Sequence, residues 1–424
     1  MTEALGPGRR DRRPWLRLRS SNFGLHRLLL AQGGSFLGDG LVLAAFPLIA
    51  AFPLIAVHVS RTPAAVAGVG LAATLPQLLV ALPAGLATDR AERRTTMARA
   101  AMLAAVALAT LAVLFDSVPV GLAVLDLVAF VVGSAQVLIA ATGSALLPQV
   151  VGSDGLERAN AWLFSMQHAV GSLGGPPLAG VLVAVGLVAP MWTAAGCYAL
   201  AAVVLASSGT AFHGSDAKRA SSLRADVVEG LKLVVGHRQL RAFMAMTAIA
   251  NVASEGVLVV LVLYAVAPGP LELSRVGYGL LLSCFAVGGI TGAAATKRLR
   301  RVGRGKLLAG SVLAIAVGLA GPGMLVDPYS AGLALAIAGF GVGCYNVTTV
   351  SFRQRVVPAA ILGRATAAYR LVALGAVPLG AVLGGVSAKL LGLRGSFLAA
   401  GALTLLCLAG IAAVSEGALR SAES

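Results

Sequence analysis

The chain alternates between long apolar runs and short polar stretches. A run of roughly 20 apolar residues is long enough to cross a hydrocarbon core of ~30 Å as a helix. The pattern therefore predicts an all-α membrane protein with twelve spans. We place these at residues 28–59, 64–87, 97–115, 118–147, 161–185, 188–208, 243–267, 276–296, 307–325, 330–351, 365–388 and 395–414.

Composition agrees with this pattern. The 424 residues are 58% hydrophobic and 12% charged, with a mean hydropathy of +0.88, whereas soluble domains are about 25% charged. The four cysteines stand singly in apolar runs, without the paired spacing of a metal or redox site. We find no HExxH, histidine cluster or phosphate-binding loop, so the sequence predicts no catalytic residue, no metal, no cofactor and no intramembrane enzyme.

The position of the basic residues decides what the net charge of +16 means. Nearly all of the 33 Lys and Arg residues fall on one side of the predicted spans, and the opposite side has only Arg61, Arg275 and Arg394. This bias predicts a multi-pass protein of the plasma (inner) membrane with both termini cytoplasmic. The arginine-rich arm is then a topology signal in contact with acidic membrane lipid, and no nucleic-acid partner is expected.

Internal repeats divide the spans into two halves. The stretch Gly85–Arg94 returns as Gly292–Arg301, and Leu156–Ala161 returns as Leu362–Ala367, each about half the chain apart. Such spacing predicts two pseudo-symmetric six-helix halves with parallel topology. The expected organisation is a basic cytoplasmic arm (1–27), an N-terminal bundle (28–208), a cytoplasmic linker (209–242), a C-terminal bundle (243–414) and a cytoplasmic tail (415–424).

The linker contains one amphipathic segment. Apolar positions from Leu223 to Val235 share one helical face, opposite charged positions that include Arg224 and Glu229. We expect a helix on the cytoplasmic surface that tethers the halves, with a regulatory partner site as the alternative.

Two carboxylates lie deep in apolar spans. Asp39 stands between Gly38 and Gly40 in the first span, and Glu255 lies at similar depth in the seventh, its repeat counterpart. Ionised carboxylates are costly at that depth, so each is expected to face a cavity or a partner. Together they could bind a proton and a cationic or polar substrate competitively; for Asp39 the alternative is a helix-to-helix hydrogen bond.

Other polar residues in the spans are further candidates for lining this cavity. Arg370 is a possible counter-ion, or else reaches toward the inner membrane surface. The remaining candidates are Asp126, Gln136, Asn251, Tyr345, Asn346 and Tyr369.

The first span carries a tandem repeat, Ala45–Ala50 followed by Ala51–Ala56. Six extra helical residues would add ~9 Å, and Pro47 and Pro53 disfavour a straight helix. We expect one copy to be displaced to the extracellular end as a kinked or unwound segment, leaving Asp39 in place.

Two motifs resemble those of a known family. One motif resembles the cytoplasmic signature loop of the major facilitator superfamily, and the residues that match it are Gly85, Asp89, Arg90, Arg93 and Arg94. This chain departs from the family pattern at Glu92, where the family usually has glycine. In the fifth span, a second set resembles the antiporter motif of drug exporters, with Trp162 and Ala179 in place of two expected glycines. This set is Gly171, Gly175, Pro176 and Gly180.

This resemblance implies the major facilitator fold and its transport mechanism. The Gly-Asp pair of the first span and the Arg-Gln-Arg before the eleventh are most similar to the branch that includes macrolide efflux proteins and the enterobactin exporter. The implied function is export of an amphipathic small molecule (drug, macrolide-like or siderophore-like) in exchange for protons by alternating access, by a monomer. The alternatives are an importer or uniporter of the same fold and a non-transporting membrane protein.

The two copies of the signature loop differ in one position. Thr296 replaces the aspartate in the second copy, so generic topology does not explain Asp89. We expect Asp89 to latch the halves on the cytoplasmic side, against the start of the eleventh span near Gly363.

Overall fold

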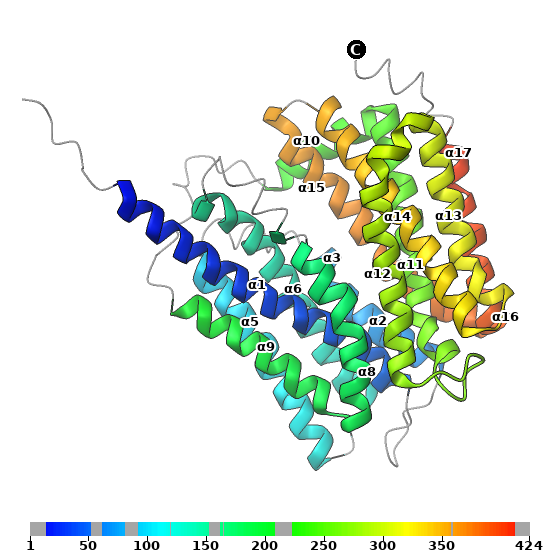
Figure 1. Ribbon diagram of the computed structural model, residues 1–424, viewed down its shortest axis with the longest axis horizontal. Coiled ribbons are helices and arrows are strands. Elements are labelled where there is room, and N and C mark those ends of the chain that lie inside the picture. Colours follow the sequence, from blue (N-terminus) through cyan, green and yellow to red (C-terminus); the bar gives the residue numbers. More distant parts are fainter. Residues whose placement is uncertain are drawn as a thin grey trace, which may run out of the picture.

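A computed structural model describes residues 14–51, 62–80, 92–118, 120–151, 162–163, 165–207, 223–357 and 359–411 (Figure 1). The described chain is almost entirely helical. The first bundle contains α1 (Pro14–Ala51), α2 (Pro63–Thr74), α3 (Pro76–Leu79), α5 (Arg93–Ser117), α6 (Leu122–Val151), the π-helical segment η1 (Gln167–Gly174), α8 (Gly175–Val185) and α9 (Ala189–Ala206). The second contains α11 (Arg238–Ala265), α12 (Arg275–Leu299), η2 (Arg300–Val302), α13 (Arg304–Met324), α14 (Pro328–Val356), α15 (Ala359–Gly375), α16 (Val377–Leu405) and α17 (Cys407–Ile411). Along the chain, the helix α10 (Leu223–Gly236) comes between the two bundles.

The described residues contain 10 helical stretches long and apolar enough to cross a membrane. One of them, Arg364–Ile411, has 48 residues, or ~72 Å of helix, which is twice the bilayer core. Its backbone breaks at Gly392, where φ is 74°, so this stretch accommodates two crossings. With the shorter apolar helix at Pro63–Leu79, the architecture confirms the predicted all-α membrane fold and is compatible with twelve spans.

Short polar caps fix where several helices begin. The side chain of Thr62 accepts a hydrogen bond from the amide of Ala65 at 3.3 Å, directly before Pro63 opens α2. Asp327 accepts from the amide of Ser330 at 2.7 Å, directly before Pro328 opens α14. A side-chain acceptor satisfies a free N–H of the first turn, and proline is tolerated at that position, so sequence dictates these starts.

The helix α1 is longer than the expected first span. It begins at Pro14, within the basic arm, and continues through Pro47 to Ala51. The first copy of the tandem repeat is therefore helical. The rest of the second copy, residues 52–56, lies outside the described residues, so displacement of one copy stays a prediction.

The two bundles contact each other through glycines. A Cβ added to Gly180 of α8 would lie 2.5 Å from the carbonyl oxygen of Arg275 at the start of α12. At a second contact between the bundles, a Cβ added to Gly385 of α16 would clash with the side chain of Ala67 of α2. These matching contacts, α8 on α12 and α16 on α2, are what two halves related by a pseudo-twofold axis should make. The bundles approach each other at this end and diverge toward the end where α10 lies (Figure 1).

The linker helix α10 packs on the second bundle. A Cβ added to Gly230 would clash with the backbone of Arg364 in α15. The Glu229 carboxylate lies 2.8 Å from the Arg364 guanidinium, and Val234 is fully buried. The expected amphipathic helix is thus present, and it rests on the start of α15.

Candidate substrate and proton site

A cavity of about 400 Å³ lies between the two bundles. Asp39 reaches it from α1 and Glu255 from α11, and these two are the charged side chains among the described residues that line it. The structure therefore brings together the two carboxylates that the sequence singled out. The other polar side chains around it are Thr74, Gln77, Gln136, Gln167, Ser172 and Tyr278.

Two glycines explain how α1 brings Asp39 to the cavity. A Cβ on Gly38 would lie 2.7 Å from the ring of Tyr198 in α9. A Cβ on Gly40 would clash with the carbonyl oxygen of Gly171 in η1, and one on Gly175 would lie 2.6 Å from the Gly40 backbone. The Gly-Asp-Gly sequence thus lets α1 fit between two neighbours while Asp39 stays at the cavity wall.

The Asp39 carboxylate belongs to a hydrogen-bonded chain. The Tyr198 hydroxyl donates to Asp39 Oδ1, and Gln136 Nε2 of α6 donates to the Tyr198 hydroxyl at 3.2 Å. Tyr198 is fully buried, so its hydroxyl is shielded from bulk water. Sequence reasoning found Gln136 but missed Tyr198, whose signal was a single phenol in an otherwise apolar span.

Glu255 has the same backbone setting with different partners. It precedes Gly256, and a Cβ on Gly384 of α16 would lie 2.5 Å from the Gly256 carbonyl oxygen. A neighbouring span therefore packs closely on the backbone that follows each carboxylate, at Gly40 because that residue lacks a Cβ and at Gly256 because Gly384 lacks one. In the described part of the chain, we find no hydrogen bond or ion pair to the Glu255 carboxylate.

A second cavity of about 220 Å³ lies within the C-terminal bundle. Thr247, Asn251 and Glu255 line it from α11, four residues apart and therefore on one helical face. Tyr345 and Asn346 line it from α14; the sequence predicted both for the cavity between the halves, and the structure places them at this second cavity. Glu255 borders both cavities, so a ligand or proton in either one can reach its carboxylate.

A hydroxyl cluster closes one side of the second cavity. The Tyr369 hydroxyl lies 2.5 Å from Thr247 Oγ1, and both Tyr369 and Tyr345 donate to the Phe243 carbonyl oxygen at 3.1 Å. The guanidinium of Arg353 lies 4.3 Å from the centre of the Tyr369 ring, a favourable placement for a cation. Arg353 is the first residue of the Arg-Gln-Arg before the eleventh span, but the sequence did not predict its contact with Tyr369.

The remaining candidates lie away from both cavities. Arg370 is exposed, as its alternative interpretation expected. Asp126 faces α2, with its carboxylate oxygens 3.7 and 3.8 Å from where a Cβ of Gly68 would lie. Neither residue lines a described cavity.

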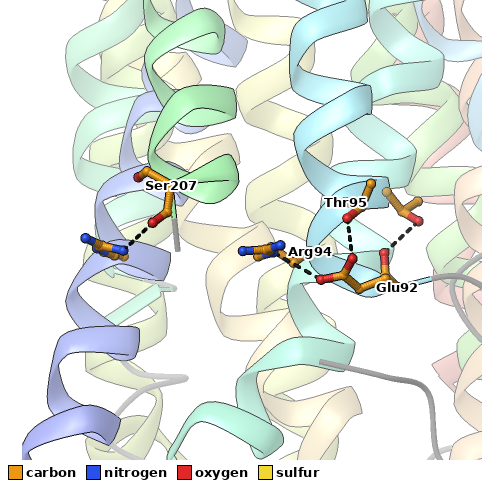
Figure 2. A network of polar contacts seen from close by, with 6 residues as sticks. Glu92, Arg94, Thr95 and Ser207 are labelled. Carbon is orange, nitrogen blue, oxygen red and sulfur yellow. Dashed lines mark hydrogen bonds and ion pairs between the residues drawn. The ribbon is translucent and has the colours of Figure 1, made fainter. Parts of the chain in front are cut away.

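Part of the signature loop is described. Gly85, Asp89 and Arg90 lie outside the described residues, and α5 begins at Arg93. Glu92 adopts φ −62°, so the missing family glycine is not needed for a positive φ at this position. Its carboxylate accepts hydrogen bonds from Arg94 Nε at 3.1 Å and from the Thr95 hydroxyl at 2.6 Å (Figure 2).

The antiporter motif links the site to the interface between the bundles. Gly171 and Gly175 face α1 beside Asp39, while a Cβ on Gly279 of α12 would clash with the carbonyl oxygen of Pro176. The π-helical segment η1 ends directly before Gly175 and Pro176. π-Helical turns often mark functional positions in helices. The segment η1 packs against both α1 and α12.

Comparisons with known proteins agree with this arrangement. The family model described as "Transmembrane secretion effector" (MFS_3) matches residues 48–424. The chain is 29% identical over 381 residues to the multidrug efflux pump Tap of Mycolicibacterium fortuitum, covering 85% of this chain and 88% of that protein.

Solved structures show the same fold. The nucleoside transporter NupG, as a mutant, superposes with a TM-score of 0.72 at 14% identity and covers 92% of this chain and 100% of its own. A bacterial homologue of the lysosomal transporter Spinster, inward-facing and unoccupied, superposes with a TM-score of 0.70 at 12% identity over 95% and 98% of the two chains. At these identities the likeness concerns the fold. The chain therefore belongs to the transmembrane secretion effector family of the major facilitator superfamily and is a multi-pass membrane transporter of small molecules.

Proposed function

We propose that this transporter exports an amphipathic small molecule, cationic or polar, in exchange for protons. The observation that carries the proposal is the cavity between the bundles, where Asp39 and Glu255 face one space from opposite halves. Its wall is otherwise mainly apolar and includes Phe36, Phe46 and Leu282. Such a wall favours an apolar body, while the carboxylates favour a positive charge or a proton.

Competition for the carboxylates would couple the two fluxes. A proton on Glu255 or Asp39 removes the negative charge that holds a cationic substrate, so proton binding from one side promotes substrate release to that side. The same carboxylates must lose their protons on the other side before substrate binds again. Exchange then follows from one shared site, without a separate path for each ligand.

The interface between the bundles supports alternating access. The helix pairs α8 with α12 and α16 with α2 meet at glycines near one end of the molecule, and the bundles diverge toward α10 (Figure 1). With the orientation expected from the basic residues, the diverging end faces the cytoplasm. Rocking about these two helix pairs would open the opposite end.

The efflux direction is supported by the relative named as a multidrug efflux pump. It is also supported by the packing of Gly171, Gly175 and Gly180, the motif whose resemblance to drug exporters suggested antiport. Both arguments point to substrate loading at the cytoplasmic side or inner leaflet.

Transport in proteoliposomes tests the proposal. Purified protein is reconstituted with an imposed pH gradient, and flux is followed for a panel of cationic dyes and macrolides. We expect flux that depends on the gradient, with coupling abolished in Asp39→Asn and in Glu255→Gln while both variants still fold. The matched control is Asp116→Asn, because Asp116 is exposed at the end of α5 and lies away from the cavity.

Two results would contradict this proposal. Absence of gradient-dependent flux for every compound in the panel would reject proton-driven export. Full coupling in both cavity variants would show that the carboxylates are structural.

A further inference from the structure

A third cavity of about 290 Å³ lies on the N-terminal bundle, between α5 and α9. It shares no lining residue with the two cavities described above. Its walls are Arg94, Thr95, Ala98, Arg99 and Met102 from α5, and Ala202 and Ala206 from α9. We call it the α5/α9 groove.

The groove exists because small residues face each other. Ala98, Ala202 and Ala206 sit where larger side chains would fill the space between the helices. Around its apolar end, the side chains of Met102 (42% exposed) and Val203 (57% exposed) point outward from the bundle. In a membrane-spanning helix, exposed apolar side chains of this kind face lipid chains.

The other end of the groove is positively charged. The Arg94 guanidinium contacts Glu92 through Nε, and among the described residues no hydrogen bond involves its two terminal nitrogens. Arg94 of α5 and Ala206 of α9 line this groove together, and Figure 2 shows Arg94 at the start of α5 and Ser207 directly after α9. Arg99 is exposed, and within the described ranges no hydrogen bond or ion pair involves its guanidinium.

The end of α9 adds no repulsion toward an anion. The carbonyl oxygen of Ser207 accepts a hydrogen bond from Arg27 Nη1 at 2.8 Å. This acceptor at the negative end of the helix dipole is therefore already neutralised by a third guanidinium. The charged end of the groove also lies at the start of α5, at the border of the membrane-spanning stretch Arg93–Ser117.

From this combination we propose that the α5/α9 groove binds an acidic phospholipid. The phosphate lies between the guanidinium groups of Arg94 and Arg99, and an acyl chain runs along Met102. Guanidinium groups suit phosphate because their paired N–H donors match its oxygens. A free anion would make no use of the apolar wall, and a soluble protein would not reach below the membrane surface, so lipid fits both ends of the groove. The proposal does not depend on what is transported.

Fluorescence quenching by brominated lipid tests this site. Trp15, Trp162 and Trp192 are first replaced by phenylalanine, and one tryptophan is introduced by Met102→Trp. The control carries Leu313→Trp instead, on the lipid-facing side of α13, where Leu313 is 45% exposed. Both are reconstituted in phosphatidylcholine that contains a small fraction of phosphatidylglycerol brominated in its acyl chains.

We expect the tryptophan at position 102 to be quenched several times more strongly than the one at position 313. Each of Arg94→Gln and Arg99→Gln should lower the apparent affinity for the acidic lipid about fivefold, because a basic residue near an anionic surface contributes about a factor of that size. Arg99→Lys should retain most of the binding. Arg298→Gln, which removes the same charge outside the groove, should change nothing.

Three results would overturn the proposal. Equal quenching at positions 102 and 313 would mean that the groove holds bulk lipid. Equal quenching by brominated phosphatidylcholine and phosphatidylglycerol would remove the selectivity for charge. Excess quenching that is unchanged in both Arg94→Gln and Arg99→Gln would show that the arginines do not bind the lipid phosphate.

Discussion

The two cavity carboxylates have similar backbone positions but different chemical surroundings. Asp39 and Glu255 each precede a glycine at which a neighbouring span packs closely. Asp39, however, accepts a hydrogen bond from a fully buried tyrosine. For Glu255 the described residues provide no such donor, and its carboxylate borders two cavities.

The two carboxylates therefore share a position in the fold but differ in the side chains that stabilise their charge. Close glycine packing gives each half of a duplicated fold a carboxylate at the same depth. The side chains around it then decide how its charge is stabilised: Tyr198 stabilises ionised Asp39, whereas Glu255 depends on a proton or a cationic ligand. We infer that Glu255 is the carboxylate that exchanges substrate for protons most directly.

The largest expected effect concerns the two glycines. A Cβ in Gly40→Ala would clash with the Gly171 backbone, whereas one in Gly256→Ala would lie 3.3 Å from the nearest atom, the Gly380 carbonyl oxygen. We expect Gly40→Ala to lower the free energy of unfolding by about 3 kcal/mol. Gly256→Ala should change it by less than about 1 kcal/mol, because alanine's helix propensity offsets mild crowding. Unfolding in detergent measures both, and equal losses would mean that the halves pack alike.

Next comes removal of the donor to Asp39. Tyr198→Phe leaves the half-buried Asp39 carboxylate without the hydrogen bond from Tyr198, which should cost about 1.5–3 kcal/mol of unfolding free energy. The matched change is Tyr278→Phe, which removes a buried cavity phenol on Glu255's side, where no hydrogen bond of the hydroxyl is found among the described residues. It should cost less than about 0.5 kcal/mol. If Asp39→Asn and Tyr198→Phe are strictly additive in a double-mutant cycle, the two groups are not coupled.

A third prediction separates the carboxylates by ligand binding. Glu255→Gln should weaken equilibrium binding of a cationic substrate about tenfold, a loss of about 1.4 kcal/mol, because it removes the carboxylate that has no hydrogen-bond or ion-pair partner among the described residues. Asp39→Asn should weaken it less than about threefold, since that carboxylate already accepts a hydrogen bond from Tyr198. Binding to purified protein at fixed pH measures both constants. Equal losses would place the substrate charge between the two groups.

The smallest effect is expected at α10, which contacts the start of α15 in the C-terminal half. The ion pair of Glu229 with Arg364 is exposed to solvent, and such pairs contribute about 0–1 kcal/mol. Glu229→Gln should therefore change the transport rate less than about twofold. By contrast, Gly230→Val should weaken docking of α10 clearly, because its Cβ would clash with the Arg364 backbone. A larger effect of the charge change would mean that the ion pair holds α10 in place.

The sequence was sufficient to predict the fold, because the thickness of the hydrocarbon core sets the length and composition of each apolar span. Three features can be interpreted without knowing which helices pack together. They are the apolar runs of fixed length, the repeats around Gly85 and Gly292, and the glycines beside Asp39. The site was partly accessible for the same reason, since a carboxylate in an apolar span needs a cavity or a partner. Asp39, Gln136 and Glu255 were found in this way and line one cavity; Asn251, Tyr345 and Asn346 line the next.

Only tertiary structure decided which neighbours meet these carboxylates. Tyr198 is far from Asp39 in sequence, and its hydroxyl reaches Oδ1 because Gly38 leaves room for its ring. Arg353, and not the predicted Arg370, lies buried against Tyr369, since helical phase within α14 and α15 cannot be known before they are packed. Likewise, the α5/α9 groove is formed by alanines of two spans whose contact no local pattern specifies.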